Sequence, residues 1–491
     1  MSSHSLQFTD VAIIGSGFSG LCVGIQLKKS SQNDFLILEK SQNVGGTWRD
    51  NSYPGAACDI PSHLYSFSFE PNPDWTRVYP VQAEIESYMN HCADKYALRS
   101  HLLFGTEVKS ITYQDITNRW LITTDSGAQI NARVVVSGTG GLSRPSIPKI
   151  SGLESFAGKV FHSSRWDHEY DLRGKNVAII GTGASAIQFV PEVIPLASQL
   201  TLFQRTPAWV VPKRDGAYSP EQRSRFKRFP FLQHINRTLI YWQHEFRALF
   251  FTQFPSLLKR LEPKVRSYIN YQLKSPELQK KMTPNYTFGC KRILLSNNFY
   301  KSLNEPNALV ITESITEITP TGIKTQDGIT HPADTIIFGT GFLVADAGLP
   351  FPVKGIKGLD LGNIWTKGSS AYLGCTVPEF PNLFLMTGPN TGLAHNSMIV
   401  MIEAQTKYIM SALKQMKKHK VKSYNLRPES LISYNQTINH RMAKTVWSIG
   451  GCKSWYISSN GRNETLWPGF TFEFILKSKN FNPDLYDPIY A

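Results

Sequence analysis

The sequence predicts an α/β fold with two Rossmann-like units, each suited to bind one dinucleotide. Two observations carry this prediction. The glycine motif GxGxxG, or its variant that ends in alanine, occurs at residues 15–20 and again at 181–186, each time between a short apolar strand and a helical pattern. The chain also has 491 residues. A single hydrophobic core rarely supports a chain of this length, so several domains are expected.

The first unit begins with a β-branched strand over residues 11–14. Its glycine turn supplies Gly15, Gly17 and Gly20, which let the backbone approach a pyrophosphate at the start of the following helix. The next apolar strand ends at Glu39, whose carboxylate can accept hydrogen bonds from a ribose 2′-hydroxyl but repels a 2′-phosphate. This unit therefore predicts a site for FAD or NAD.

The second unit repeats the pattern after an apolar strand at 177–180. Its turn consists of Gly181, Thr182, Gly183, Ala184, Ser185 and Ala186. The following strand ends near Arg205, and Glu39 and Arg205 each lie 24 residues after the first glycine of their turn (39 − 15 and 205 − 181). A guanidinium with Thr206 beside it suits the 2′-phosphate of NADPH. The alternative is an ordinary exposed arginine.

The rest of the chain is divided by changes in pattern. Strand patterns at 121–124 and 132–137 lead into a glycine- and proline-rich hinge at 138–148, helical patterns rich in aromatic and basic residues fill 222–282, and strands resume at 309–312 and 334–338. We predict an FAD-binding domain formed by 1–145 and 346–491, an NADPH-binding domain formed by 146–215 and 286–345, and a helical insertion at 216–285.

Composition and charge narrow the class of protein. The hydrophobic content of 41% supports sizeable cores, and the net charge of +15 is compatible with nucleic acid, an anionic membrane surface or polyanionic small molecules. No nucleic-acid motif accompanies the charge, so nucleic acid is not an expected partner. The six cysteines form no CxxC pair, which argues against a metal site and favours reduced thiols. No apolar run reaches the roughly 20 residues that span a bilayer. We expect a soluble, cytoplasmic protein with at most peripheral membrane contact.

One segment makes the family recognisable. Phe156, Gly158, His162, Trp166 and Asp167 satisfy in full the fingerprint FxGxxxHxxxW followed by Pro or Asp. Because of this segment, the chain resembles the class B flavoprotein monooxygenases, and most closely the Baeyer-Villiger monooxygenases. The resemblance extends from about residue 10 to about residue 474.

Some positions depart from the pattern of that family. Ala57 stands where arginine is frequent, Arg49 where an aromatic residue is frequent, and Gly339 where alanine is usual. The first two leave the shape of the pocket and the substrate class open.

The resemblance implies which residues hold the cofactors. For FAD these are Gly15, Gly17, Gly20, Glu39, Thr47, Trp48, Asp59, Tyr65, Val108 and Met398. For NADPH they are Thr182, Gly183, Ala184, Ser185, Ala186, Gln188, Arg205, Thr206, Lys291 and Arg292. Without the resemblance, Lys291 and Arg292 read as a solvated basic pair.

The resemblance also implies a reaction. NADPH reduces FAD, the reduced flavin and O2 form a C4a-peroxyflavin, and this inserts one oxygen atom into a ketone to give an ester or lactone. Arg292 is implied as the catalytic cation, with Asp59 orienting it, because a fixed cation stabilises the peroxide and the oxyanion. His162 is implied to act in domain movement and NADPH-dependent catalysis, and we favour this over direct proton transfer.

Several alternatives stay open. The same chemistry acts on soft nucleophiles in sulfide or amine oxygenating enzymes. A protein of another class would be a non-catalytic FAD-binding scaffold at a membrane or partner surface. The helical insertion either covers the NADPH domain, which we favour, or lies on a membrane. The natural substrate, the regioselectivity and the oligomeric state are not predicted.

Overall fold

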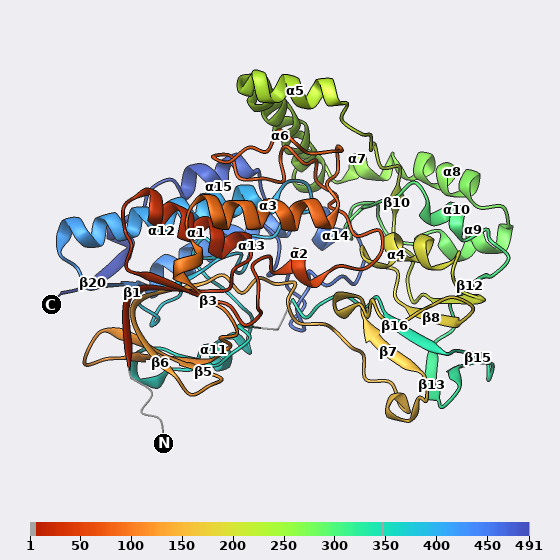
Figure 1. The fold of residues 1–491 in the computed structure, drawn as a ribbon, viewed down its shortest axis with the longest axis horizontal. Coiled ribbons are helices and arrows are strands. Elements are labelled where there is room, and N and C mark those ends of the chain that lie inside the picture. Colours follow the sequence, from red (N-terminus) through yellow and green to blue (C-terminus); the bar gives the residue numbers. More distant parts are fainter. Residues whose placement is uncertain (1–5, 345–347, 491) are drawn as a thin grey trace.

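The computed structural model describes residues 6–344 and 348–490 and contains two large sheets, the first mixed and the second parallel (Figure 1). The first sheet has the order β17-β4-β5-β6-β1-β2-β3, with β18 paired to β6. The second has the order β12-β9-β8-β16-β7. Both contain the predicted strands, which confirms the doubled α/β fold, while the domain boundaries stay predictions.

The strands of the first sheet are β1 (Gln7–Ile14), β2 (Phe35–Leu38), β3 (Leu102–Leu103), β4 (Val108–Gln114), β5 (Arg119–Thr124), β6 (Gln129–Ser137), β17 (Val353–Lys354) and β18 (Leu383–Leu385). Those of the second are β7 (Lys159–His162), β8 (Asn176–Ile180), β9 (Gln199–Phe203), β12 (Ala308–Ile311) and β16 (Thr335–Phe338). Smaller sheets are formed by β10 (Val210–Val211) with β11 (Leu294–Leu295), by β13 (Ile315–Thr319), β14 (Gly322–Thr325) and β15 (Thr330–Pro332), and by β19 (Ser423–Leu426) with β20 (Tyr486–Ile489).

The helices are α1 (Phe18–Lys29), α2 (Thr47–Asp50), α3 (Gln82–Lys95), α4 (Ala186–Val193), α5 (Pro220–Arg228), α6 (Pro230–Thr252), α7 (Ser256–Lys259), α8 (Glu262–Gln272), α9 (Pro276–Met282), α10 (Phe299–Ser302), α11 (Leu361–Trp365), α12 (Met398–His419), α13 (Pro428–Met442), α14 (Val446–Ile449) and α15 (Thr471–Lys477). Short 3-10 turns occur at Arg99–His101, Leu153–Ser155, Ser163–Arg165, Ile356–Gly358 and Pro483–Leu485.

The two glycine turns are built in the same way. Gly15 and Gly181 both have positive φ, +97° and +110°, which favours glycine. A Cβ on Gly15 would lie 2.7 Å from the carbonyl oxygen of Gly138, and one on Gly181 would lie 2.5 Å from that of Gly339. Gly138 follows β6, which pairs with β1, and Gly339 follows β16, which pairs with β8. Each turn therefore packs against the end of the strand beside the first strand of its own unit.

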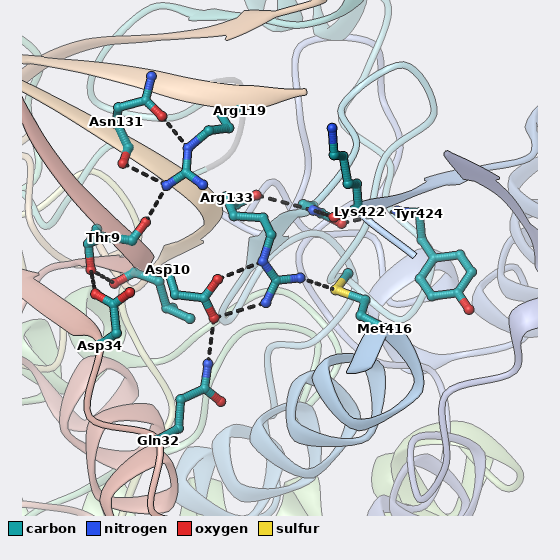
Figure 2. A network of polar contacts seen from close by, with 12 residues as sticks. Thr9, Asp10, Gln32, Asp34, Arg119, Asn131, Arg133, Met416, Lys422 and Tyr424 are labelled. Carbon is teal, nitrogen blue, oxygen red and sulfur yellow. Dashed lines mark hydrogen bonds and ion pairs between the residues drawn. The ribbon is translucent and has the colours of Figure 1, made fainter. Parts of the chain in front are cut away.

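A later segment of the chain returns to the first sheet, where β18 pairs with β6, and Figure 2 shows polar contacts that hold it there. Arg133 of β6 forms an ion pair with Asp10 of β1, 2.6 Å from Nε to Oδ1, and its Nη1 lies 3.3 Å from the sulfur of Met416 in α12. The amide of Asn382 donates to the carbonyl oxygens of Arg133 and Lys422. These bonds join strands from both ends of the chain.

The helical insertion contacts more than the NADPH unit. Gln233 of α6 donates to Nδ1 of His63 at 3.0 Å, and Arg237 donates to the carbonyl oxygen of His63 at 2.7 Å. Glu245 accepts from Asn396 at 2.7 Å, just before α12. The expectation that the insertion covers the NADPH domain is therefore incomplete, because α6 also forms hydrogen bonds with the segments around His63 and Asn396, which lie beside elements of the first unit.

The cysteines require a correction. Cys290 and Cys452 form a disulfide across 162 residues of sequence, whereas Cys22, Cys58, Cys92 and Cys375 are free and buried. The prediction that all thiols are reduced is wrong for this pair, because the fold brings together two residues whose spacing carries no local signal. Within the described ranges, no helix is both long and apolar enough to cross a membrane.

Candidate active site

Both glycine turns present a helix start suited to an anion. The N-cap residues of α1 and α4, Gly17 and Ser185, make no side-chain capping bond, so the first N–H groups of each helix are not used by the cap. A Cβ on Gly17 would come no closer than 3.9 Å to its nearest neighbour, and one on Gly183 no closer than 3.8 Å. A Cβ at the second glycine of each turn would thus make only ordinary van der Waals contact with the protein, and both turns fit a pyrophosphate.

Glu39 is fixed at the end of β2. Its carboxylate accepts from the backbone N–H and the hydroxyl of Ser16, at 2.9 and 2.7 Å, and from the N–H of Ser41 at 2.9 Å. Arg49, one of the departures from the family pattern, adds an ion pair at 3.2 Å. The acid is thus held beside the first glycine turn, where the predicted ribose contact needs it.

The other predicted FAD residues gather from several parts of the sequence. The indole N–H of Trp48 donates to the hydroxyl of Tyr65 at 2.9 Å, and Tyr65 packs edge-on against Phe18 at the start of α1. Thr47 begins α2, Val108 begins β4 and Met398 begins α12. Burial raises the pKa of Tyr65, so its hydroxyl stays protonated.

The predicted phosphate site of the second unit is a cluster of cations. Arg205 is exposed just after β9, and Thr206 beside it is half-buried. Burial lowers the pKa of Lys291, and the positive charge of Arg205 adds to this. Lys291 also lies 4.8 Å from the ring centre of Tyr286. Two cations that repel each other are stabilised by an anion between them, which fits the predicted contact with a 2′-phosphate.

Gln188, predicted to bind NADPH, joins the two units. Its amide donates to the carbonyl oxygen of Ala57 at 2.9 Å and accepts from the hydroxyl of Tyr53 at 3.0 Å. A Cβ on Gly55 would lie 2.8 Å from the carbonyl oxygen of Gln188, so the backbone of this segment packs directly on α4. The sequence carried no signal for this role.

Asp59 and Arg292 meet although 233 residues separate them. Nε and Nη2 of the guanidinium donate to the two carboxylate oxygens at 2.9 and 2.8 Å, a bidentate pair. The Asp59 carboxylate raises the pKa of Arg292. Both side chains keep about a quarter of their surface accessible, 26% for Asp59 and 28% for Arg292. The pair that the resemblance implied is formed, and it stays open to a reactant.

A tyrosine that the sequence did not single out lies beside this pair. The hydroxyl of Tyr456 is buried and finds no hydrogen-bond partner among the described residues. Burial raises the pKa of Tyr456 to about 12, against the opposing effect of Arg292. The Cys290–Cys452 disulfide ties the loop of Arg292 to the segment that carries Tyr456. Two remote parts of the chain are thereby held together around Arg292.

His162 is engaged at both ring nitrogens. The backbone N–H of Ser164 donates to Nδ1 at 3.1 Å, so Nδ1 is the acceptor. Nε2 lies 2.9 Å from the carbonyl oxygen of Gly341 and therefore carries the proton. Burial lowers the pKa of His162, which keeps this neutral form. With no free nitrogen, the ring is placed to link β7 to the segment after β16 and not to move protons.

The rest of the fingerprint packs around the same link. A Cβ on Gly158 would lie 2.2 Å from the carbonyl oxygen of Asp334, so only glycine fits there. Phe156 is buried, and Trp166 lies 5.3 Å from Phe189 between ring centres. Asp167 forms an ion pair with Lys159. These contacts are structural.

The fold and the site define a class, a flavoprotein with two dinucleotide-binding units. The model for "Pyridine nucleotide-disulphide oxidoreductase" matches residues 12–239. A Baeyer-Villiger monooxygenase of Pseudomonas aeruginosa is 49% identical over 97% of this chain and 90% of its own, and one of Streptomyces coelicolor is 46% identical over 94% and 89%. The crystal structure of cyclohexanone monooxygenase from Rhodococcus sp. Phi1 bound to NADP+ superposes with a TM-score of 0.89 at 28% identity, covering 99% of this chain and 100% of that one.

The chain belongs to the Baeyer-Villiger monooxygenase family. It is an enzyme that depends on FAD and NADPH.

Proposed function

We propose that this enzyme uses NADPH and O2 to insert one oxygen atom into a ketone, giving an ester or lactone, and that Arg292 is its catalytic cation. The observation that carries the proposal is the bidentate Asp59–Arg292 pair, which connects the two halves of the site. The names of the similar proteins, Baeyer-Villiger and cyclohexanone monooxygenases, support a ketone as the substrate.

The two units divide the binding of the cofactors. Glu39 and the turn at 15–20 hold the adenosine and pyrophosphate of FAD, and Arg205, Thr206 and Lys291 hold the 2′-phosphate of NADPH. FAD, once reduced by NADPH, supplies the electrons that activate O2.

The geometry of Arg292 suits a negative oxygen. Its bonds to Asp59 use Nε and Nη2, which leaves the N–H groups of Nη1 for the oxygen that gains charge during the reaction. The carboxylate keeps the guanidinium oriented before the reactant arrives, so no reorganisation is needed at that moment. Removal of one such donor from an active site typically slows the reaction by about 10²- to 10³-fold.

The test is to remove this cation and follow the two half-reactions separately. Arg292→Ala should keep FAD and still consume NADPH at a reduced rate, while ester formation falls at least 100-fold and hydrogen peroxide accumulates instead. Arg292→Lys is the matched control, since it keeps the charge but loses the bidentate fork, and should retain part of the ester yield. Full ester yield from Arg292→Ala would show that the catalytic cation lies elsewhere.

A second assay distinguishes ketones from sulfides as the substrate class. Purified enzyme is incubated with NADPH, air and panels of cyclic, linear and aryl ketones and of sulfides, and products are identified by mass. Sulfoxides without esters would favour the sulfide-oxygenating alternative. A cytoplasmic location belongs to the proposal as well, and cell fractionation checks it.

A further inference from the structure

A row of large apolar side chains lies exposed along α6. Phe231, Ile235, Leu239, Trp242 and Phe246 are 59%, 52%, 65%, 54% and 60% exposed. At 100° per residue they fall within an arc of about 80° on one side of the helix. We call these five residues the α6 stripe. Of the 26 large hydrophobic residues that are exposed in the described chain, eight lie between Phe229 and Leu261.

The stripe cannot turn inward, because the other side of α6 is fixed. That side buries Gln233, His244, Glu245, Ala248, Phe251 and Thr252. The Glu245 carboxylate accepts from Asn396 and Thr471, at 2.7 and 2.5 Å, so a buried charged group locks the rotation of the helix. The stripe therefore faces outward as a consequence of the fold.

The apolar surface continues beyond α6. The ring of Trp242 lies 6.2 Å from that of Phe472 at α15, and Leu476 on the same short helix is 66% exposed. Figure 1 shows α5 and α6 at the top of the view, above both sheets and near the middle of the long axis. A surface that protrudes fits a broad, flat partner better than a small ligand.

The charge around the stripe selects the kind of partner. Residues 216–261 contain eight Lys or Arg against two acidic residues, a net charge of +6. Leaving out Glu245, which is buried, and Arg237, which bonds inward to His63, does not change this net charge. Arg225 and Arg228 are exposed on α5, and Lys259 and Arg260 are exposed after α6. Two copies of this chain would bring like charges together, which opposes self-association through this face.

From this combination we propose that α5, α6 and the start of α15 form a docking surface for an anionic lipid bilayer. The aromatic and aliphatic side chains of the stripe enter the interface between headgroups and acyl chains, and the flanking basic residues contact the anionic headgroups. Trp242 and the phenylalanines are the residue types that favour this depth. Docking places the enzyme where apolar substrates accumulate, without a helix that spans the bilayer.

The test is flotation of the FAD-loaded full-length enzyme with vesicles. Wild type should float with phosphatidylcholine vesicles that contain phosphatidylglycerol, and much less with phosphatidylcholine alone. The double variant Leu239→Gln/Trp242→Gln should bind at least tenfold more weakly, and Arg225→Glu/Arg228→Glu should lose the preference for anionic vesicles. Ile116→Gln, which changes a 97% exposed residue in the β4–β5 turn, and Arg173→Glu are matched controls that should bind like wild type.

Flavin content and NADPH oxidation in detergent-free buffer should be unchanged in all variants, which shows that they fold. Wild type that remains unbound, or stripe variants that float like wild type, would overturn the proposal. Light scattering of wild type and of the stripe variant tests whether the stripe instead binds a second copy of the chain. A dimer that becomes a monomer in Leu239→Gln/Trp242→Gln would assign the stripe to a second copy and also overturn it.

Discussion

The two dinucleotide units share one architecture, and two of the positions at which they differ bear on what each unit binds. In each unit the first glycine packs against the residue that follows a neighbouring parallel strand, Gly138 after β6 in one unit and Gly339 after β16 in the other. The first unit ends its second strand with the buried acid Glu39, and the second ends the equivalent strand near the exposed base Arg205. The backbone sets where a nucleotide binds, and the charge at the strand end sets which nucleotide it is.

The second difference concerns the last residue of the turn. A Cβ on Gly20 would lie 1.9 Å from the carbonyl oxygen of Gly15, whereas the second unit carries Ala186 at the matching position. The first turn is therefore tighter than the second. Equivalent substitutions should then have unequal consequences.

The largest expected effect follows from this inequality. Gly20→Ala should abolish FAD binding, because backbone atoms must move to admit the methyl group. Ala186→Gly, the reciprocal change, should cost only about 1 kcal/mol of helix stability and leave NADPH binding measurable. Flavin absorbance after purification and NADPH titration check the two variants. Stable FAD binding by Gly20→Ala would contradict the claim that the first turn is tighter than the second.

The second prediction concerns the link between the units. His162 donates to Gly341, which follows Gly339 in the second unit as Gly140 follows Gly138 in the first. His162→Ala should lower kcat by roughly 100-fold through misalignment of the units, with FAD content unchanged. His162→Gln, which keeps an N–H donor, should recover part of the rate. Loss of FAD in His162→Ala would instead make this residue part of a structural core.

The third prediction addresses the phosphate site. Arg205→Ala should weaken the binding of NADPH by about 1 to 3 kcal/mol, or roughly 5- to 150-fold in Kd. The binding of NADH should change little, because only NADPH has the 2′-phosphate. Lys291→Ala should act in the same direction. The comparison of Kd values for the two nucleotides is the measurement. A matching loss of NADH affinity would show that Arg205 acts on the shared part of the nucleotides.

The last prediction concerns acid. His63, His244 and His395, all buried where α6 meets the first unit, have their pKa lowered by burial to about 4, 4 and 3, with nearby arginines adding to the effect. Because the folded pKa lies below the unfolded value of 6.5, their contribution to stability is complete above pH 6.5 and is lost as the pH falls towards 4.

In that pH window, each of these histidines lowers the free energy of unfolding by about 1.4 kcal/mol for every unit by which the pH falls. Denaturant unfolding at pH 7.5 and 5.0 checks the effect. His63→Gln should flatten the decline, and His419→Gln, at the end of α12, is a control on the protein surface. An identical decline in wild type and His63→Gln would show that other groups govern the response to acid.

Local patterns predicted much of this molecule. The strands on both sides of each glycine turn, and the contrast between Glu39 and Arg205, follow from apolar periodicity and spacing. The Asp59–Arg292 pair needed the family resemblance, because no local rule connects residues 233 positions apart. The Cys290–Cys452 disulfide and the Gln188–Ala57 contact went unpredicted for the same reason. The stripe on α6 was visible as a basic aromatic helix, but its exposed side depends on how Glu245 is anchored.

The account rests on the claim that charge at equivalent strand ends assigns the two cofactors. Anaerobic stopped-flow reduction of the bound flavin by NADPH and by NADH tests it most directly. The account predicts reduction by NADPH at micromolar concentrations, a much lower efficiency with NADH, and loss of this preference in Arg205→Glu, which gives the second unit the charge of the first. Equal efficiency of the two nucleotides with the wild-type enzyme would contradict it.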